Sequence, residues 1–264
     1  MEAAFFDLDK TVIAKSSVMA FGAPFYREGL ISKRTIVRGI YAQFVYMLVG
    51  ADDEKMERMR EAMLALTRGW DQQRVKDIVR ETLEEVVSPI IYAEALELIE
   101  AHHAAGRKTV IISSSPIETV EPLGEFLGVD AVIATQPRLD SEGRYTGDLE
   151  FYAYGPHKAD AMREMAVAEQ IDLAASYAYS DSITDLPMLE LVGNPVVVNP
   201  DKDLLRVARD RDWEVRHFER PVRLRDRVPA PPRGSTIAAG GALAAAGTGV
   251  ALYLWLRRRV EAPA

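Results

Sequence analysis

Short apolar runs, each followed by a stretch with helical periodicity, recur along the sequence. Runs that are apolar throughout are typical of strands covered on both faces, as in a parallel sheet. Helices are predicted over residues 91–105 and 156–168, and a strand with a β-hairpin, Gly143 in its turn, over residues 131–149. The alternation predicts an α/β fold with a Rossmann-like parallel sheet flanked by helices. The runs predicted as buried strands are Ala3–Phe6, Lys108–Ser113, Tyr177–Ser180 and Val196–Val198.

Residues 14–88 interrupt this alternation with three predicted helices in succession. The first begins at Ser32, the second at Asp52 or Asp53 and the third at Asp71. A row of methionines on the second helix is interpreted as core packing rather than as a ligand set; these are Met56, Met59 and Met63. We expect a helical cap over the site, inserted between two parts of one catalytic core, residues 1–13 and 89–218.

The C-terminal region has two parts of different composition. Residues 219–234 are basic and rich in proline, as in a linker, and residues 235–256 carry no charge. At about 1.5 Å per residue, a helix of that length spans the hydrocarbon layer. Tyr253, Trp255 and the short basic tail 257–264 favour a single transmembrane helix over a mobile tail or a helix at the membrane surface.

Charges beside this predicted span indicate its orientation. More arginines precede the span than follow it, so we expect a single-pass cell-membrane protein with a cytoplasmic catalytic domain. The small residues Gly240, Ala244 and Gly247 could let two tails pack together as a homodimer.

The composition excludes several kinds of chemistry. A net charge of −8 disfavours nucleic acid as the partner. The chain has no cysteine, which excludes disulfides, thiol catalysis and cysteine zinc sites. Its four histidines show no ligand spacing, and the N-terminus has neither the basic nor the apolar segment of a signal peptide.

Two carboxylates follow the first predicted strand. In an extended chain, residues two apart point to the same side, so Asp7 and Asp9 could face one reacting atom together. One could attack an electrophile and become a covalent intermediate, and the other could move the proton of the leaving group. Since a lone Asp-x-Asp is usually a solvated turn, this interpretation depends on what the other strand ends carry.

Two further polar residues stand at predicted element ends. Ser113 ends a strand beside a helix start, where doubly wound sheets bind ligands, and could hold an anionic oxygen. An ordinary helix cap by Ser114 or Ser115 is the alternative there. Lys158 lies in the first turn of a predicted helix, which is unfavourable for the helix dipole. Its ammonium group could point into the site, whereas a solvated lysine is the alternative.

A second pair of carboxylates, Asp181 and Asp185, follows the strand Tyr177–Ser180 on a turn leading into a helix. Carboxylate oxygens together with waters and phosphate oxygens are the ligands that Mg²⁺ prefers. The pair therefore predicts a magnesium site.

Four segments occur in the order of the four motifs of the haloacid dehalogenase superfamily, which this chain resembles over about residues 2–218. They are Asp-Leu-Asp-Lys-Thr from Asp7, Ser-Ser-Ser-Pro from Ser113, Lys158, and Ser-Asp-Ser-Ile-Thr-Asp-Leu-Pro-Met-Leu from Ser180. The resemblance is closest to the phosphoserine-phosphatase-like branch, and with its tail the chain is similar to membrane-tailed actinobacterial members. It implies a Mg²⁺-dependent phosphomonoester hydrolase acting through an aspartyl-phosphate.

The resemblance also implies a role for each of these residues. Asp7 is similar to the nucleophile, and Asp9 to the acid that protonates the leaving alkoxide and then activates water. Ser113 and Lys158 resemble the groups that bind phosphate oxygens. The implied metal ligands are Asp7, the backbone carbonyl of Asp9 and Asp181, with Asp185 in the adjoining shell.

One stretch departs from the pattern. True phosphoserine phosphatases carry an acidic residue soon after the first motif that contacts the substrate amine, whereas residues 14–17 here are Ala-Lys-Ser-Ser. The expected substrate is therefore a small phosphorylated molecule, with phospholipid or lysophospholipid phosphate as the alternative. A phosphotransferase is a further alternative, and a non-catalytic membrane adaptor has the least support because all six site residues are present.

Overall fold

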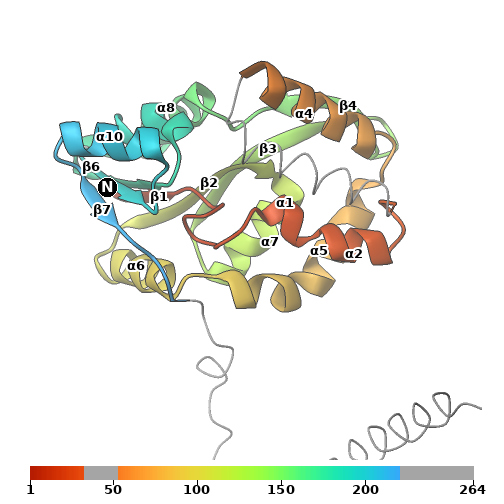
Figure 1. The fold of residues 1–264 in the computed structure, drawn as a ribbon, viewed down its shortest axis with the longest axis horizontal. Helices are drawn as coiled ribbons and strands as arrows, with labels where there is room; N and C mark the ends of the chain where they lie inside the picture. The colour runs from red at the N-terminus through yellow and green to blue at the C-terminus, as the bar shows by residue number, and fades with distance from the viewer. Residues whose placement is uncertain (33–52, 221–264) are drawn as a thin grey trace, which may run out of the picture. The chain divides into compact units, whose positions relative to one another are not determined.

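The structure is a computed structural model that describes residues 1–32 and 53–220. Within these ranges, seven strands form one sheet in the order β4-β3-β2-β1-β5-β6-β7 (Figure 1). All neighbouring strands pair in parallel except β3 and β4, so the expected Rossmann-like sheet is confirmed. The strands are β1 Ala3–Phe6, β2 Lys108–Pro116, β3 Ala131–Leu139, β4 Tyr145–Phe151, β5 Tyr177–Ser180, β6 Asn194–Val198 and β7 Glu214–Arg216.

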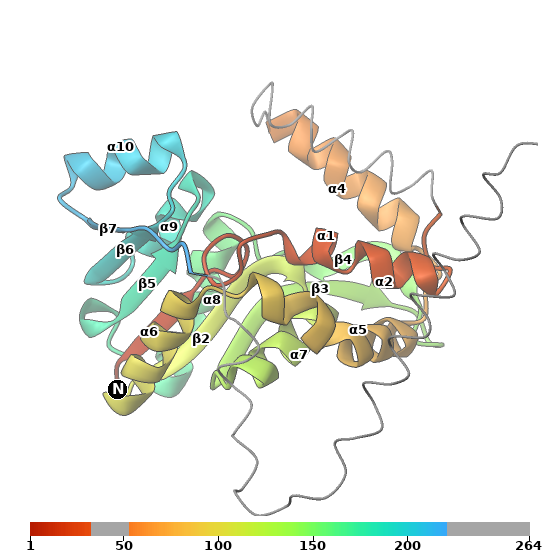
Figure 2. The same cartoon turned by 60° about the horizontal axis from the view of Figure 1, so that its bottom comes forward.

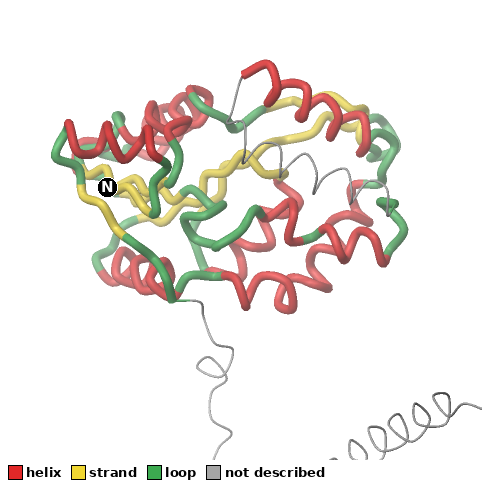
Figure 3. Tube along the Cα trace, in the orientation of Figure 1, coloured by secondary structure: helices red, strands yellow, loops and turns green. Residues whose placement is uncertain are grey.

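Helices cover both faces of this sheet (Figure 3). The α-helices are α1 Ser17–Ala20, α2 Gly22–Arg27, α4 Asp53–Thr67, α5 Gln72–Val87, α6 Ala93–Ala104, α7 Ile117–Leu127, α8 Pro156–Glu169, α9 Leu186–Leu189 and α10 Lys202–Asp210. The 3₁₀ helices are η1 Ser88–Ile90, η2 Leu173–Ala175 and η3 Ile183–Asp185.

The alternation of side chains along β1 produces two separate cores. Phe6 belongs to the core shared with α6 and α7, whereas Phe5 belongs to the core shared with α8, α9 and α10. Both rings are almost fully buried, and burying a side chain of this size stabilises a fold by about 1.5–3 kcal/mol. The short strand that carries the first motif is therefore held from both faces, and the residues that follow it start from a rigid position.

The inserted segment 14–88 begins and ends at one place in the core. The Ala14 N–H donates to Ile90 O at 2.7 Å and the Tyr92 N–H donates to Val12 O at 3.0 Å. Helix α5 begins at the expected cap, where Asp71 Oδ1 accepts from the Arg74 N–H at 2.8 Å. This helix packs against α7, so it extends the helical layer on that face of the sheet (Figure 2).

Helix α4 packs against β4, the edge strand of the sheet. Met63 on this helix is 40% exposed, and for this residue the prediction of core packing is wrong. The side chains of Met56 and Met59, and the helix predicted to begin at Ser32, lie outside the described structure.

The strand and the hairpin that were predicted separately over residues 131–149 share one long strand, β3. β3 runs unbroken to Leu139 and pairs with β4 in antiparallel fashion. Gly143 lies in the connecting turn with φ of 75°, a conformation that costs glycine little because it has no Cβ. The β4 strand of this pair forms the edge of the sheet and contacts α4.

None of the helices within residues 1–32 and 53–220 is long and apolar enough to cross a membrane. The predicted span 235–256, the linker from residue 221 and the tail 257–264 fall outside these ranges. The transmembrane helix, the homodimer and the cytoplasmic orientation therefore stay predictions.

Candidate active site

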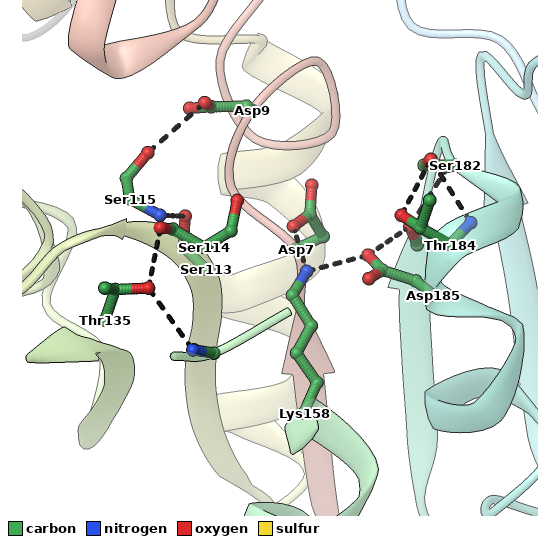
Figure 4. A network of polar contacts seen from close by, with 12 residues as sticks. Asp7, Asp9, Ser113, Ser114, Ser115, Thr135, Lys158, Ser182, Thr184 and Asp185 are labelled. Atoms are coloured by element: carbon green, nitrogen blue, oxygen red, sulfur yellow. Dashed lines mark hydrogen bonds and ion pairs between the residues drawn. The ribbon is translucent and has the colours of Figure 1, made fainter. Parts of the chain in front are cut away.

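The predicted site residues lie around the carboxyl ends of three adjacent strands. Figure 4 shows Asp7, Ser113, Lys158 and Asp185 among them. Asp7 follows β1, Ser113 lies near the end of β2, and Asp181 follows β5. In the sheet, β1 lies between β2 and β5, so the strand order changes direction at β1. Ligands of open α/β sheets bind in the crevice at such a switch in strand order.

Lys158 is drawn into this crevice from the first turn of α8. Its Nζ donates to Asp7 Oδ1 at 2.6 Å and to Asp185 Oδ2 at 2.8 Å, and the residue is 2% exposed. The alternative of a solvated lysine is therefore wrong. Burial alone would lower the pKa of Lys158, but the carboxylates of Asp185 and Asp7 outweigh it and raise that pKa. The side chain is a permanent ammonium group in the site.

Negative charge exceeds positive charge in this cluster. Asp7, Asp181 and Asp185 are all buried, and the one buried cation beside them in the described chain is Lys158. Lys10 lies 3.8 Å from Asp181, but its side chain is 62% exposed and its charge is screened by water. Two negative charges are thus left largely uncompensated.

The excess of negative charge changes how the carboxyl groups titrate. Burial raises the pKa of Asp7 well above its ordinary value, Lys158 lowers it in part, and Asp185 and Asp181 raise it further. Burial raises the pKa of Asp181 to about 7, against a lowering by Lys10 and with a further rise from Asp185. An added cation beside these groups would restore their ordinary acidity.

These residues suit a divalent metal ion by their charge. Across residues 1–32 and 53–220, no three acidic or histidine side chains form a ready metal cage. Mg²⁺ usually takes only one or two carboxylates and completes its shell with waters and phosphate oxygens. Asp7 and Asp181 supply oxygen donors within a cluster whose negative charge exceeds its positive charge, so they fit that requirement.

Asp9 does not lie where an extended chain would place it. β1 ends at Phe6, and a turn with Lys10 at φ of 63° follows, so the alternation of strand side chains does not reach Asp9. Asp9 Oδ1 accepts from the Ser17 N–H at 2.9 Å and Oδ2 accepts from the Ser115 hydroxyl at 3.3 Å. Burial raises the pKa of Asp9, and these bonds lower it in part.

Ser113 is 1% exposed and its Oγ accepts from the Ser115 N–H at 3.2 Å. Because the oxygen accepts this bond, the hydroxyl hydrogen remains available for an anionic ligand. The alternative of a helix cap by Ser114 or Ser115 is wrong, since the N-cap residue of α7 is Pro116 and has no side-chain cap.

Three serines at this site were not predicted to take part in it. The Ser180 hydroxyl donates to Asp185 Oδ2 at 2.7 Å and so fixes the carboxylate that Lys158 contacts. Ser17 and Ser115 hold Asp9, as described above. The position of Ser180 at a strand end was a usable signal, whereas nothing local in the sequence relates Ser17 to Asp9.

The arrangement suits transfer of a group with several anionic oxygens. The Lys158 ammonium contacts the Asp7 carboxylate, the Ser113 hydroxyl lies on the neighbouring strand β2, and the excess of carboxylates suits an added cation. Together these groups could neutralise such a group as the carboxylate approaches it. Asp9 follows Asp7 in the turn after β1, and burial raises the pKa of its carboxyl group, which favours a role in proton transfer.

Comparison with known proteins agrees with this chemistry. The family model described as haloacid dehalogenase-like hydrolase matches residues 4–190. The inhibition of morphological differentiation protein of Streptomyces azureus is 54% identical over 262 residues, covering 98% of this chain and 95% of that protein. Phosphoserine phosphatase SerB1 of Mycobacterium tuberculosis is 34% identical over 245 residues, covering 92% of this chain and 79% of that one.

The fold is similar to that of a solved phosphoserine phosphatase. A structure titled as a phospho-aspartyl intermediate analogue of that enzyme superposes with a TM-score of 0.59, covering 85% of this chain and 96% of the other. The two sequences are 16% identical, so this likeness concerns the fold.

Proposed function

The chain belongs to the haloacid dehalogenase-like hydrolase family and is a phosphatase similar to phosphoserine phosphatases, and from this premise we propose that it hydrolyses phosphomonoesters through an aspartyl-phosphate on Asp7. One observation carries the proposal: the buried Lys158 ammonium bonds the Asp7 carboxylate within a crevice that has excess negative charge. A carboxylate can approach a phosphate dianion only where cations offset their repulsion.

Each half of the reaction uses Asp7 and Asp9 in turn. Asp7 attacks the phosphorus, the bond from phosphorus to the leaving oxygen breaks, and Asp9 gives that oxygen its proton. Asp9, now ionised, takes a proton from water, whose oxygen attacks the phosphorus. The bond to Asp7 then breaks and releases inorganic phosphate. Lys158 and Ser113 hold the phosphate oxygens throughout.

The side chains that would hold Mg²⁺ are Asp7 and Asp181, with the backbone carbonyl of Asp9 as a further ligand and Asp185 in the adjoining shell. When bound, the ion would neutralise charge on the phosphoryl group and on these carboxylates. Asp185 is fixed for this role by Ser180 and Lys158.

The raised pKa of Asp181 predicts an unusual pH dependence for the metal-free protein. In the folded protein the pKa of the Asp181 carboxyl group is about 7. Between pH 4 and 7 this group is therefore ionised in the unfolded chain but protonated in the folded protein. Folding therefore takes up a proton, and stability falls as the pH rises through this window. In EDTA we expect the free energy of unfolding to fall by up to about 3 kcal/mol from pH 5 to pH 8.

Thermal unfolding at several pH values, with EDTA or with Mg²⁺, measures this effect. Mg²⁺ should remove most of the loss at pH 8, and Asp181→Asn should weaken the pH dependence, whereas Asp172→Asn at an exposed helix cap should not. A melting temperature in EDTA that is constant or rises over this range would contradict the prediction.

A lipid phosphate is a second candidate substrate, favoured by the place where the chain leaves the catalytic unit. β7 is parallel to β6, so its carboxyl end lies at the same edge of the sheet as the site. Arg220 is bound there: its carbonyl accepts from the Ala93 N–H at 2.8 Å, and its Nη2 donates to Glu97 at 2.7 Å. The uncharged stretch 235–256 and the absence of an acidic residue at positions 14–17 also favour a lipid phosphate over phosphoserine.

Phosphate release by the full-length protein with Mg²⁺ tests both candidates. L-Phosphoserine in solution is compared with phosphatidic acid in vesicles, and Asp7→Asn serves as the blank. We expect release from at least one of them. Transfer of the phosphoryl group to added glycerol in place of water would favour a phosphotransferase, and no release or transfer from any phosphomonoester would overturn the proposed function.

A further inference from the structure

Both oxygens of the Asp9 carboxylate are held by serines that have no part in the chemistry described above. The Ser17 N–H donates to Oδ1 at 2.9 Å. The Ser115 hydroxyl donates to Oδ2 at 3.3 Å, a bond that Figure 4 shows. Attachment at both oxygens limits rotation of the carboxyl plane, which a single hydrogen bond would leave free.

The two serines also bond each other. Their Oγ atoms lie 2.7 Å apart, and Ser17 and Ser115 are only 1% and 3% exposed. A hydroxyl has one hydrogen to donate. When Ser115 gives its hydrogen to Asp9, the Ser17 hydroxyl must be the donor to Ser115. The three groups thus form one chain of hydrogen bonds, in which each bond strengthens the next.

The two serines approach Asp9 from different parts of the fold. Ser115 lies at the end of β2 in the core, whereas Ser17 is the first residue of α1 in the inserted segment. The Ser115 backbone N–H also donates to Ser113 Oγ at 3.2 Å. Ser115 therefore contacts both the hydroxyl assigned to phosphate and the carboxyl assigned to proton transfer.

We propose that Ser115, supported by Ser17, is a positioning residue that holds the Asp9 carboxyl where it can protonate the leaving oxygen. This inference rests on the proposed function, because it takes Asp9 as the proton donor. General acid catalysis requires the donor within hydrogen-bond reach of the leaving oxygen. A carboxyl group that loses one of the hydrogen bonds holding it spends less time in that position.

The proposal is tested with two substrates that differ in their need for a proton. An alkyl phosphate leaves as a strongly basic alkoxide and needs acid catalysis, whereas p-nitrophenyl phosphate leaves as a stabilised phenolate and needs little. For Ser115→Ala we expect kcat/KM to fall about tenfold on the alkyl phosphate. On the aryl phosphate we expect a fall of less than about twofold. A merely structural role would lower both equally.

The surrounding backbone allows a sharper variant at Ser17. This residue occupies the first position of α1 and the preceding Ser16 has ψ of 127°, so proline is compatible there. Ser17→Pro removes both the N–H and the hydroxyl, and we expect the same selective loss on the alkyl phosphate. Ser17→Ala keeps the N–H and should therefore lose less than Ser17→Pro.

Two control variants separate positioning from stability. Ser115→Thr keeps the hydroxyl and should restore most of the alkyl activity. Ser176 is equally buried and bonds Ala3 N and Asp172 O at the opposite edge of the sheet. Ser176→Ala should lower the melting temperature by a similar amount but leave the ratio of the two kcat/KM values unchanged.

Asp9→Asn distinguishes the positioning role of Ser115 from the role of Asp9 as proton donor. If Asp9→Asn lowers alkyl activity selectively but Ser115→Ala lowers both substrates equally or neither, the positioning role is overturned and the proposed function stands. If Asp9→Asn shows no selective loss, Asp9 is not the proton donor, and the positioning role falls with that assignment.

Discussion

Replacing Asp7 with asparagine is expected to lower phosphate release by on the order of 10⁴-fold or more. The amide oxygen is a poor nucleophile, so no covalent intermediate forms, although Lys158 and Ser113 can still bind a phosphate group. The fold should tolerate the change, because burial and two neighbouring carboxylates already disfavour the charge on Asp7. Phosphate release and acid-quench trapping of a radiolabelled phosphoenzyme measure the two consequences separately.

A matched variant controls for the loss of an aspartate as such. Asp172 accepts from the Ala174 N–H at 3.0 Å on the surface, before β5 and away from the site. Asp172→Asn should keep both activity and phosphoenzyme labelling. Labelling of Asp7→Asn at the level of the unchanged protein would show that the phosphoryl group is attached elsewhere.

Replacing Lys158 with methionine is expected to reduce both activity and stability. Activity should fall by about 10³-fold, since no other described cation contacts Asp7. The loss of the ammonium also leaves Asp7 and Asp185 buried without their partner, which costs about 3–5 kcal/mol at neutral pH. At lower pH the cost should shrink, because burial raises the pKa of Asp7 and the variant lacks the ammonium that lowers it, so this carboxyl group can become neutral.

Lys108 offers the matched control for this variant. Its ammonium pairs with Glu169 at the start of β2, away from the site, and remains partly exposed. Lys108→Met should therefore change stability by about 1 kcal/mol or less and leave turnover intact. Chemical unfolding at pH 5 and pH 7.5, with turnover measured in parallel, compares the two variants. Equal stability losses at both positions would mean that the pairs of Lys158 contribute no more than a surface ion pair.

Two local features of the sequence allowed most of the fold to be predicted. Continuous apolar runs marked β1, β2, β5 and β6, and the periodic stretches between them marked the helices of the core. These patterns report burial, which is a property of each segment and its immediate surroundings. The same logic fails at the edge of the sheet, where α4 has the periodicity of a covered helix but leaves Met63 exposed.

The candidate site could be predicted because its residues follow the predicted strands. Parallel strands bring their carboxyl ends to one edge, so Asp7, Ser113 and Asp181 were expected together before any distance was known. Lys158 in the first turn of α8 and Asp185 at the N-cap of α9 lie at the same edge of the sheet.

The sequence by itself therefore determined the α/β class, the order of the main elements and the chemical groups available at the site. Only the tertiary structure decided how those groups are held: Lys158 between Asp7 and Asp185, and Asp9 between Ser115 and Ser17. The physical reason is that sequence periodicity is local, whereas most of these contacts join residues far apart in the chain. Periodicity records which face of a segment is buried, but hydrogen bonds such as that between Ser17 and Ser115, 98 residues apart, depend on how distant segments pack and which rotamers they select.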